Sequence, residues 1–272
     1  MMKRLLAIEL QKIWKNKASR VLTITYFGLL SLIALVASIK FDVGPIHINV
    51  AEQGVFNFPF IWHFNSFIAV FAKVFFAVII VSMMSNEYSY GTLKQNLIDG
   101  MSKQEFIASK FITVVTFSIA STIFVFIISL VLGLFFSTYN EISIIFSRME
   151  YLLAYFVNLV GFFSFCLFVG ILIKRSAFAL GFLFMWFLIE CYLVYSRLGL
   201  KESVARFLPL ESMSQLLIEP FTKLSAIKTI NSQIGIVNVK DYDVHFSTII
   251  IVLAWTAIFV YGSYYLLKKR DL

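Results

Sequence analysis

The sequence predicts an all-α integral membrane protein with six transmembrane helices, and three observations support this prediction. Of the 272 residues, 60% are hydrophobic and 14% are charged, whereas soluble domains average about 25% charged residues. The apolar residues gather in blocks of roughly 20 or more, the length needed to cross a hydrocarbon core as a helix. Most Lys and Arg residues lie between these blocks or near the chain ends. Because this placement is typical of membrane topology, the net charge of +8 does not predict a nucleic-acid partner.

Six apolar blocks are expected to cross the bilayer within one transmembrane domain, residues 1–272. The first follows a basic stretch, but it is longer than the core of a signal peptide and no convincing cleavage site follows it, so we expect it to be retained. The fourth and fifth blocks are together too long for one crossing and predict a tight helical hairpin. The predicted spans are 21–39, 61–85, 107–136, 151–173, 176–195 and 246–267.

The distribution of basic residues predicts that both termini lie in the cytoplasm. With the N-terminus inside, the segments that share its side hold 14 Lys and Arg residues. The two short loops on the other side, 40–60 and 137–150, hold Lys40 and Arg148. This asymmetry follows the positive-inside rule and predicts a multi-pass protein of the cell (cytoplasmic) membrane.

Two segments outside the spans have patterns of their own. Residues 2–18 place Leu6, Leu10 and Ile13 opposite several lysines, which predicts an amphipathic helix on the inner membrane surface. Residues 197–245 form a long external segment, whose apolar stretch around Leu208 predicts short helices at the outer interface. The Asn/Asp-rich end of this segment, Asn231 to Asp243, is expected to be a loop.

The cytoplasmic segment 86–105 is predicted to contain a short helix over 92–99, followed by the start of a long one. Gly100 suits a helix C-terminal cap, and Ser102 with Glu105 has the spacing of a capping box. Apolar residues recur at helical spacing: Leu93, Leu97, Ile98 and Met101. A short helix joined to two spanning helices can transmit a mechanical displacement to them. The alternative is an ordinary amphipathic connector at the lipid interface.

The order of residues in this segment resembles the membrane permease subunits of ABC-2 type transporters. The likeness rests on Glu87-x-x-x-Gly91-Thr92, then Ser102-Lys103 and Lys110. The six-span layout, the basic N-terminal helix, the external Leu208-Pro209 pair and the C-terminal Lys-Lys-Arg-Asp-Leu are also similar to that family. Lys103 is a departure, since many relatives carry Arg there.

The resemblance implies that segment 86–105 is a coupling helix region that docks on a separate cytoplasmic ABC ATPase. The chain has no Gly-x-x-x-x-Gly-Lys-Ser/Thr sequence, so ATP and Mg²⁺ are expected on the partner and no cofactor is expected in this chain. The implied assembly has a second permease, identical or homologous, in membrane lipid. It would export an amphipathic substrate, such as a lipid, drug or antimicrobial peptide. The candidate docking residues are Glu87, Gly91, Thr92, Leu93, Leu97, Ser102, Lys103 and Glu105.

Two charged residues, Lys73 and Glu190, are expected near the middle of their spans at nearly the same depth. An unpaired charge at the centre of a membrane helix costs about 2.5–3.5 kcal/mol, so each requires a partner or a watery cavity. We hypothesise that Lys73 and Glu190 pair across the bundle. The functional alternative is contact with the substrate.

The sequence offers little for catalysis, and we expect no enzyme activity in this chain. His47, His63 and His245 have no metal-ligand spacing, and no Gly-x-Ser-x-Gly motif occurs. Cys166 and Cys191 lie in apolar blocks, where they are expected to act as small hydrophobic residues. A membrane scaffold or assembly protein is the rival to the transporter interpretation, and an intramembrane enzyme ranks third.

Overall fold

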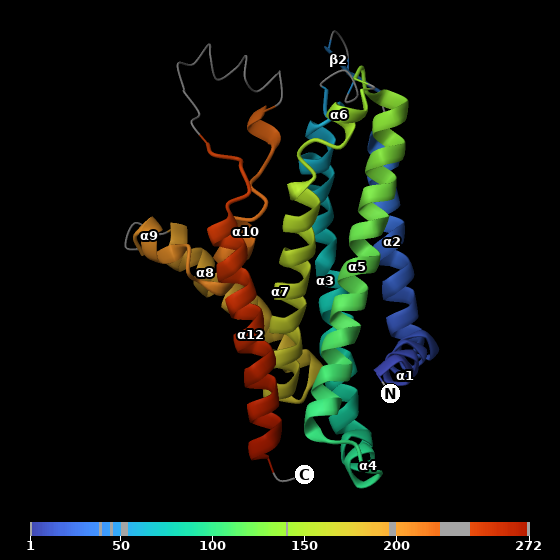
Figure 1. The fold of residues 1–272 in the computed structure, drawn as a ribbon, viewed down its shortest axis with the longest axis vertical. Helices are drawn as coiled ribbons and strands as arrows, with labels where there is room; N and C mark the ends of the chain where they lie inside the picture. Colours follow the sequence, from blue (N-terminus) through green and yellow to red (C-terminus); the bar gives the residue numbers. More distant parts are fainter. Residues whose placement is uncertain are drawn as a thin grey trace.

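A computed structural model describes residues 2–37, 40–43, 46–49, 54–139, 141–195, 200–223 and 240–270. The fold is a bundle of long helices (Figure 1). Five helices of the described chain are long and apolar enough to cross a membrane, which indicates a multi-pass membrane protein. These are α3 (Phe60–Ser89), α5 (Lys103–Phe136), α7 (Glu150–Ile173, preceded by α6, Ile142–Ile145), α8 (Ser176–Tyr195) and α12 (Phe246–Lys269).

A further helix, α2 (Lys17–Ala37), lies where the first span, 21–39, was predicted. Residues 38 and 39 fall outside the described residues. Because α2 is not one of the five helices above, the six-span count stays a prediction. The amphipathic helix predicted over 2–18 is present as α1 (Met2–Lys15), which lies across the lower end of the bundle (Figure 1).

The two ends of the bundle carry different elements (Figure 1). The lower end holds both chain termini and the short helix α4 (Thr92–Ile98). The upper end holds α6 and a hairpin of β1 (Lys40–Val43) and β2 (Ile46–Asn49). The two strands are antiparallel, with Lys40 opposite Asn49. This hairpin was not predicted, since the sequence indicated a loop over 40–60.

The core of the bundle is built around α7, which is buried along most of its length. Its neighbours are α3 and α12, and glycines permit close packing against both. A Cβ atom added at Gly161 would lie 2.8 Å from Val252 of α12, and one at Gly170 would lie 3.1 Å from Met84 of α3. By contrast, α8 is largely exposed and leans away from the bundle (Figure 1). An apolar helix with an exposed surface suits contact with lipid or another chain.

Several hydroxyl groups inside the bundle bond to one another or to the helix backbone, whereas the buried hydroxyls of Ser66, Ser85 and Ser263 have no partner within the described residues. Tyr155 lies 2.9 Å from the Tyr26 hydroxyl and 2.8 Å from Ser121 Oγ, which joins α2, α5 and α7. Thr113 and Ser118 of α5 donate to the carbonyl oxygen four residues earlier. Polar groups in a membrane bundle need such partners because lipid supplies none.

The segment after α8 contains short helices, as the sequence predicted for 197–245. They are α9 (Glu202–Ala205), α10 (Pro209–Ser214) and the 3₁₀ turn η2 (Phe221–Lys223). Pro209 occupies the first turn of α10, where its missing N–H costs no hydrogen bond. The loop predicted for Asn231 to Asp243 lies mostly outside the described residues.

The close contact at Gly161 predicts that a larger side chain there will destabilise the fold. Gly161→Leu should lower the stability of the purified protein by about 1–3 kcal/mol, because Val252 and Met213 leave no room for the side chain. The effect is measured by thermal unfolding in detergent, in which the fraction of protein that remains monodisperse is recorded as the temperature rises. Gly28→Leu is the control, since no atom lies within 4 Å of a Cβ there. Equal stability of the two variants would contradict the packing.

Candidate functional site

A buried network of charged side chains joins α1, α3 and α5 at the lower end of the bundle. Lys110 of α5 is fully buried, and its Nζ lies 2.6 Å from Glu9 Oε2 and 2.7 Å from Glu87 Oε1. Glu9 and Glu87 are themselves 5% and 3% exposed. One ammonium group thus bridges two carboxylates from helices far apart in the sequence. Because removing either sign of charge would leave the other uncompensated, these residues depend on one another.

Two more side chains complete this network. Lys12 is 41% exposed at the edge of the network, and its Nζ lies 2.9 Å from Glu87 and 3.4 Å from Glu9, so two ammonium groups balance the two carboxylates. Burial lowers the pKa of Lys12, but the two carboxylates raise it by more, so the net pKa lies above its ordinary value. Thr92 Oγ1 donates to Glu87 Oε2 at 2.5 Å, which ties the first residue of α4 to the same carboxylate. We call Glu9, Lys12, Glu87, Thr92 and Lys110 the ion network.

The ends of α4 follow the local sequence closely. Gly91, before α4, and Gly100, after it, have φ angles of 68° and 97°, which favour glycine. The Ser102 hydroxyl accepts from the Glu105 N–H, and the Glu105 carboxylate accepts from the Ser102 N–H. The predicted short helix, glycine cap and capping box are therefore confirmed.

One side of α4 packs on the bundle and the other is exposed. Leu93 is 2% exposed and Leu97 is half-buried against the core. Tyr90 and Ile98, in contrast, are each 74% exposed. We call the exposed side the outer face of α4; it comprises Tyr90, Lys94, Gln95, Ile98 and Asp99.

Four of the eight predicted docking residues lie behind this outer face and hold α4 in place. Glu87 and Thr92 belong to the ion network, and Leu93 and Leu97 pack inward. Ser102 and Glu105 start α5. Lys103 donates to the carbonyl oxygens of Lys268 and Arg270, at 3.3 and 3.2 Å, and so fastens the end of α12. Gly91 is exposed at the turn before α4.

Sequence reasoning missed Glu9 and Lys12 of the ion network. The available signal was an acidic residue on an otherwise basic amphipathic helix, three positions before a lysine. Nothing local placed α1 beside α3. The exposed Tyr90 was also missed.

The hypothesis that Lys73 pairs with Glu190 is wrong. Lys73 Nζ donates instead to Asn158 Oδ1 at 3.0 Å and lies 4.4 Å from the centre of the Phe162 ring. Glu190 accepts from the indole N–H of Trp186 on its own helix. Equal depth did not bring the two charges together because α8 leans away from α3 and α7.

Glu190 instead caps the short helix α10. Its carboxylate accepts from the backbone N–H groups of Leu210 and Glu211, at 2.9 and 3.0 Å. No side chain within α10 supplies that cap, and a negative charge is favoured at a helix N-terminus. Near the other end of α10, the Met213 carbonyl oxygen accepts from Asn158 at 2.6 Å. Asn158 therefore links α10 to Lys73.

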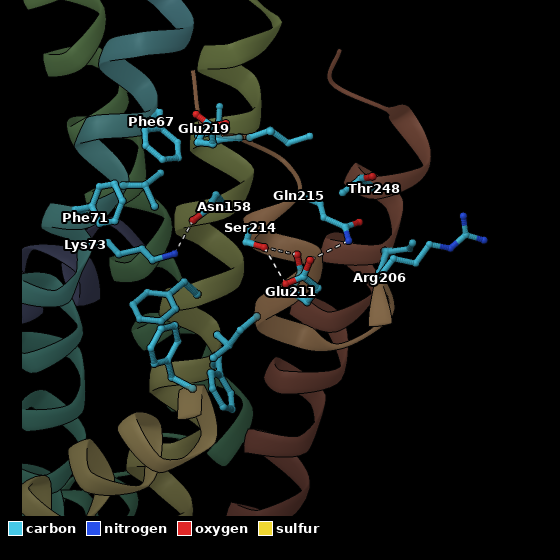
Figure 2. A pocket seen from close by; sticks show the side chains of 18 of the residues that line it. Phe67, Phe71, Lys73, Asn158, Arg206, Glu211, Ser214, Gln215, Glu219 and Thr248 are labelled. Carbon is cyan, nitrogen blue, oxygen red and sulfur yellow. Dashed lines mark hydrogen bonds between the residues drawn. The ribbon is translucent and has the colours of Figure 1, made fainter. Parts of the chain in front are cut away.

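A large cavity of about 1850 Å³ lies beside these contacts, lined by residues of α3, α7, α8, α10 and α12. Figure 2 shows Lys73 reaching from α3 toward Asn158, with Phe67 and Phe71 on the same helix. Glu211, Ser214 and Gln215 of the α10 region are hydrogen-bonded to one another on the opposite wall (Figure 2). The wall formed by α3, α7 and α8 is mainly apolar apart from Lys73 and Asn158, and most of the other polar lining residues come from 203–219 and 240–248.

The comparisons with known proteins assign a family but no activity. A family described as "Protein of unknown function (DUF2705)" matches residues 28–272, which is most of the chain. The chain belongs to this family. No curated protein matches this DUF2705 member. The family description names neither a substrate nor a partner, so the function of this DUF2705 protein has to be argued from its own residues.

The ion network predicts that Lys110 is required for a stable fold. Lys110→Met should destabilise this DUF2705 protein by about 3–5 kcal/mol, because two buried carboxylates lose the buried one of the two ammonium groups that balance them. Thermal unfolding in detergent measures the loss. Lys94→Met, on the exposed side of α4, serves as the control.

A second variant separates charge from packing in this experiment. Adding Glu87→Gln to Lys110→Met should recover part of the stability, because one uncompensated carboxylate is removed. A double variant no more stable than Lys110→Met, or a single variant as stable as the natural protein, would contradict the role of the ion network.

Proposed function

We propose that this chain is the transmembrane permease subunit of an ATP-driven ABC exporter that moves an amphipathic substrate across or out of the membrane. The ATPase is a separate cytoplasmic subunit, which binds ATP and Mg²⁺. A second permease, identical or homologous, completes the transport path. The chain itself carries no catalytic group in this proposal.

The observation that carries the proposal is the anchoring of α4. Its outer face is exposed at the same end of the bundle as both termini (Figure 1). Its base is tied by Thr92 and Glu87 to the ion network, and thereby to α1, α3 and α5. A force applied to this face would act on two long helices directly. This is the arrangement that a coupling helix needs.

The rival interpretations explain less of this arrangement. A connector resting on lipid would turn its apolar residues toward the membrane, whereas two of the three apolar residues of α4, Leu93 and Leu97, pack against the protein and only Ile98 is exposed. A scaffold also needs an exposed face, but it does not need α4 to be tied to several long helices by buried charges. The scaffold therefore stays the second candidate, distinguished by its independence of any ATPase.

The proposal takes α2 as the first of six spans and places the lower end in the cytoplasm. At about 1.5 Å per residue, the 21 residues of α2 extend about 31 Å, close to the thickness of the hydrocarbon core. The lower end carries most of the Lys and Arg residues near the spans, which supports a cytoplasmic position.

The proposal predicts that the chain binds an ATPase through Ile98. Affinity purification of the tagged, full-length chain from its native membrane in mild detergent should recover a soluble subunit with a phosphate-binding loop. Ile98→Glu should abolish that recovery, because it places a negative charge on an exposed apolar residue of the outer face of α4. Ile142→Glu is the matched control, since Ile142 is also 74% exposed but lies at the upper end.

The possible outcomes separate the candidate functions. Recovery of an ATPase with the natural chain and with Ile142→Glu, but not with Ile98→Glu, supports the permease and its docking face. An ATPase that is still recovered with Ile98→Glu would reject the docking face. Absence of any ATPase from a folded, monodisperse preparation of the natural chain would favour the scaffold.

A further inference from the structure

The large cavity has room for a molecule of lipid size and walls suited to an apolar body. Its volume of about 1850 Å³ exceeds the roughly 300–1,000 Å³ of common small-molecule pockets. Phe71, Phe184 and Phe187 are at least 50% exposed, which leaves their rings available for contact. Six phenylalanine rings of the wall come from α3, α7 and α8: Phe67, Phe71, Phe162, Phe165, Phe184 and Phe187.

Lys73 supplies a positive charge to this wall that no carboxylate neutralises among the described residues. Its hydrogen bond goes to the neutral amide of Asn158, and its nearest ring is Phe162. An ammonium group has three N–H donors, so two are left for a further partner. Figure 2 shows Lys73 crossing from α3 toward α7 at the edge of the cavity.

The acidic residues of the same wall already have partners. Glu211 bonds to Ser214 and Gln215, Glu219 to Lys240, and Asp241 to His245. Arg206 lies over the ring of Phe207, and its guanidinium group points away from Lys73 (Figure 2). The part of the cavity around Lys73 therefore carries one positive charge amid aromatic side chains.

We propose that this cavity binds an amphipathic anion whose carboxylate or phosphate group pairs with Lys73 and whose apolar body lies against the phenylalanine rings. Lys73 is 13 residues from Phe60, or about 20 Å along α3, and 16 residues from Ser89. An anion held at either end of α3 would not reach Lys73, so it has to enter the bundle to pair with this residue. That the anion is also the transported substrate rests on the proposed function, whereas its binding does not.

A binding experiment on the full chain tests this inference without any ATPase. The chain is placed in nanodiscs of neutral phosphatidylcholine and titrated with 11-(dansylamino)undecanoic acid, whose fluorescence reports an apolar environment. The uncharged methyl ester of the same molecule is the matched probe. The variants are Lys73→Met, which removes the charge, Lys73→Arg, which retains it, and Lys17→Met, an exposed lysine at the start of α2.

The acid should bind at least about tenfold more weakly to Lys73→Met, because a hydrogen-bonded charge pair is lost. Lys73→Arg and Lys17→Met should bind it within about twofold of the natural chain. The ester should not distinguish Lys73→Met from the natural chain. The inference is overturned if the natural chain does not bind the acid or if Lys73→Met binds it equally well. It is also overturned if Lys73→Met binds the acid and the ester more weakly by the same factor.

Competition identifies the source of the anion. Displacement of the probe by phosphatidic acid placed in the disc indicates a membrane lipid, and displacement by soluble decanoate indicates a free amphiphile; displacement by neither overturns the proposal. The result is independent of the ATPase test. If the chain binds the anion but no ATPase is recovered, the binding site is supported and the exporter is rejected. If an ATPase is recovered but the chain does not bind the anion, the exporter is supported and the binding site is rejected.

Discussion

The fold depends on how each buried charge is compensated where water is absent. An uncompensated ion in a medium of low dielectric constant is costly, so each buried charged side chain needs a counter-charge, oriented N–H groups or a polar amide beside it. Lys110 is held between two carboxylates, and Glu190 receives two backbone N–H groups of α10. Lys73 donates a hydrogen bond to the Asn158 amide oxygen and lies over an aromatic ring, without a counter-charge among the described residues. Lys110 and Glu190 are therefore compensated within the protein, whereas Lys73 keeps N–H donors for a further partner.

The ion network joins four helices at the lower end of the bundle. Glu87 is shared by Lys12, Thr92 and Lys110, so α1, α4 and α5 all meet at one residue of α3. Interactions of this kind are strong where solvent is excluded, and they are directional. The network therefore fixes the orientation of α4 with its outer face exposed. It also makes the amphipathic helix α1 part of the same unit rather than a separate element on the membrane surface.

The sequence predicted the features that are set locally. Long apolar blocks gave the membrane helices, and glycine and Ser102 marked the limits of α4 and the start of α5. It did not predict the position of Glu9, because the contact with Lys110 joins residues 101 positions apart. Equal depth suggested that Lys73 and Glu190 would meet, but depth says nothing about direction around a helix axis or about the tilt of α8. The hairpin at Lys40–Asn49 was missed although Phe41 and Val43, and then Ile46 and Ile48, alternate with polar residues, because each run is four residues long and the segment was interpreted only as a loop between two spans.

Helix α3 connects the two parts of the molecule on which the functional argument rests. Glu87 lies near its lower end and Lys73 near its middle, 14 residues or about 21 Å apart along one continuous helix. Asn158 holds both Lys73 and the Met213 carbonyl of α10, while Glu190 holds the start of α10. A shift of α3 relative to α7 would therefore change the Lys73–Asn158 contact and the wall of the cavity together. Because the ion network attaches α4 to this same helix, a force on the outer face of α4 has a direct structural path to the cavity.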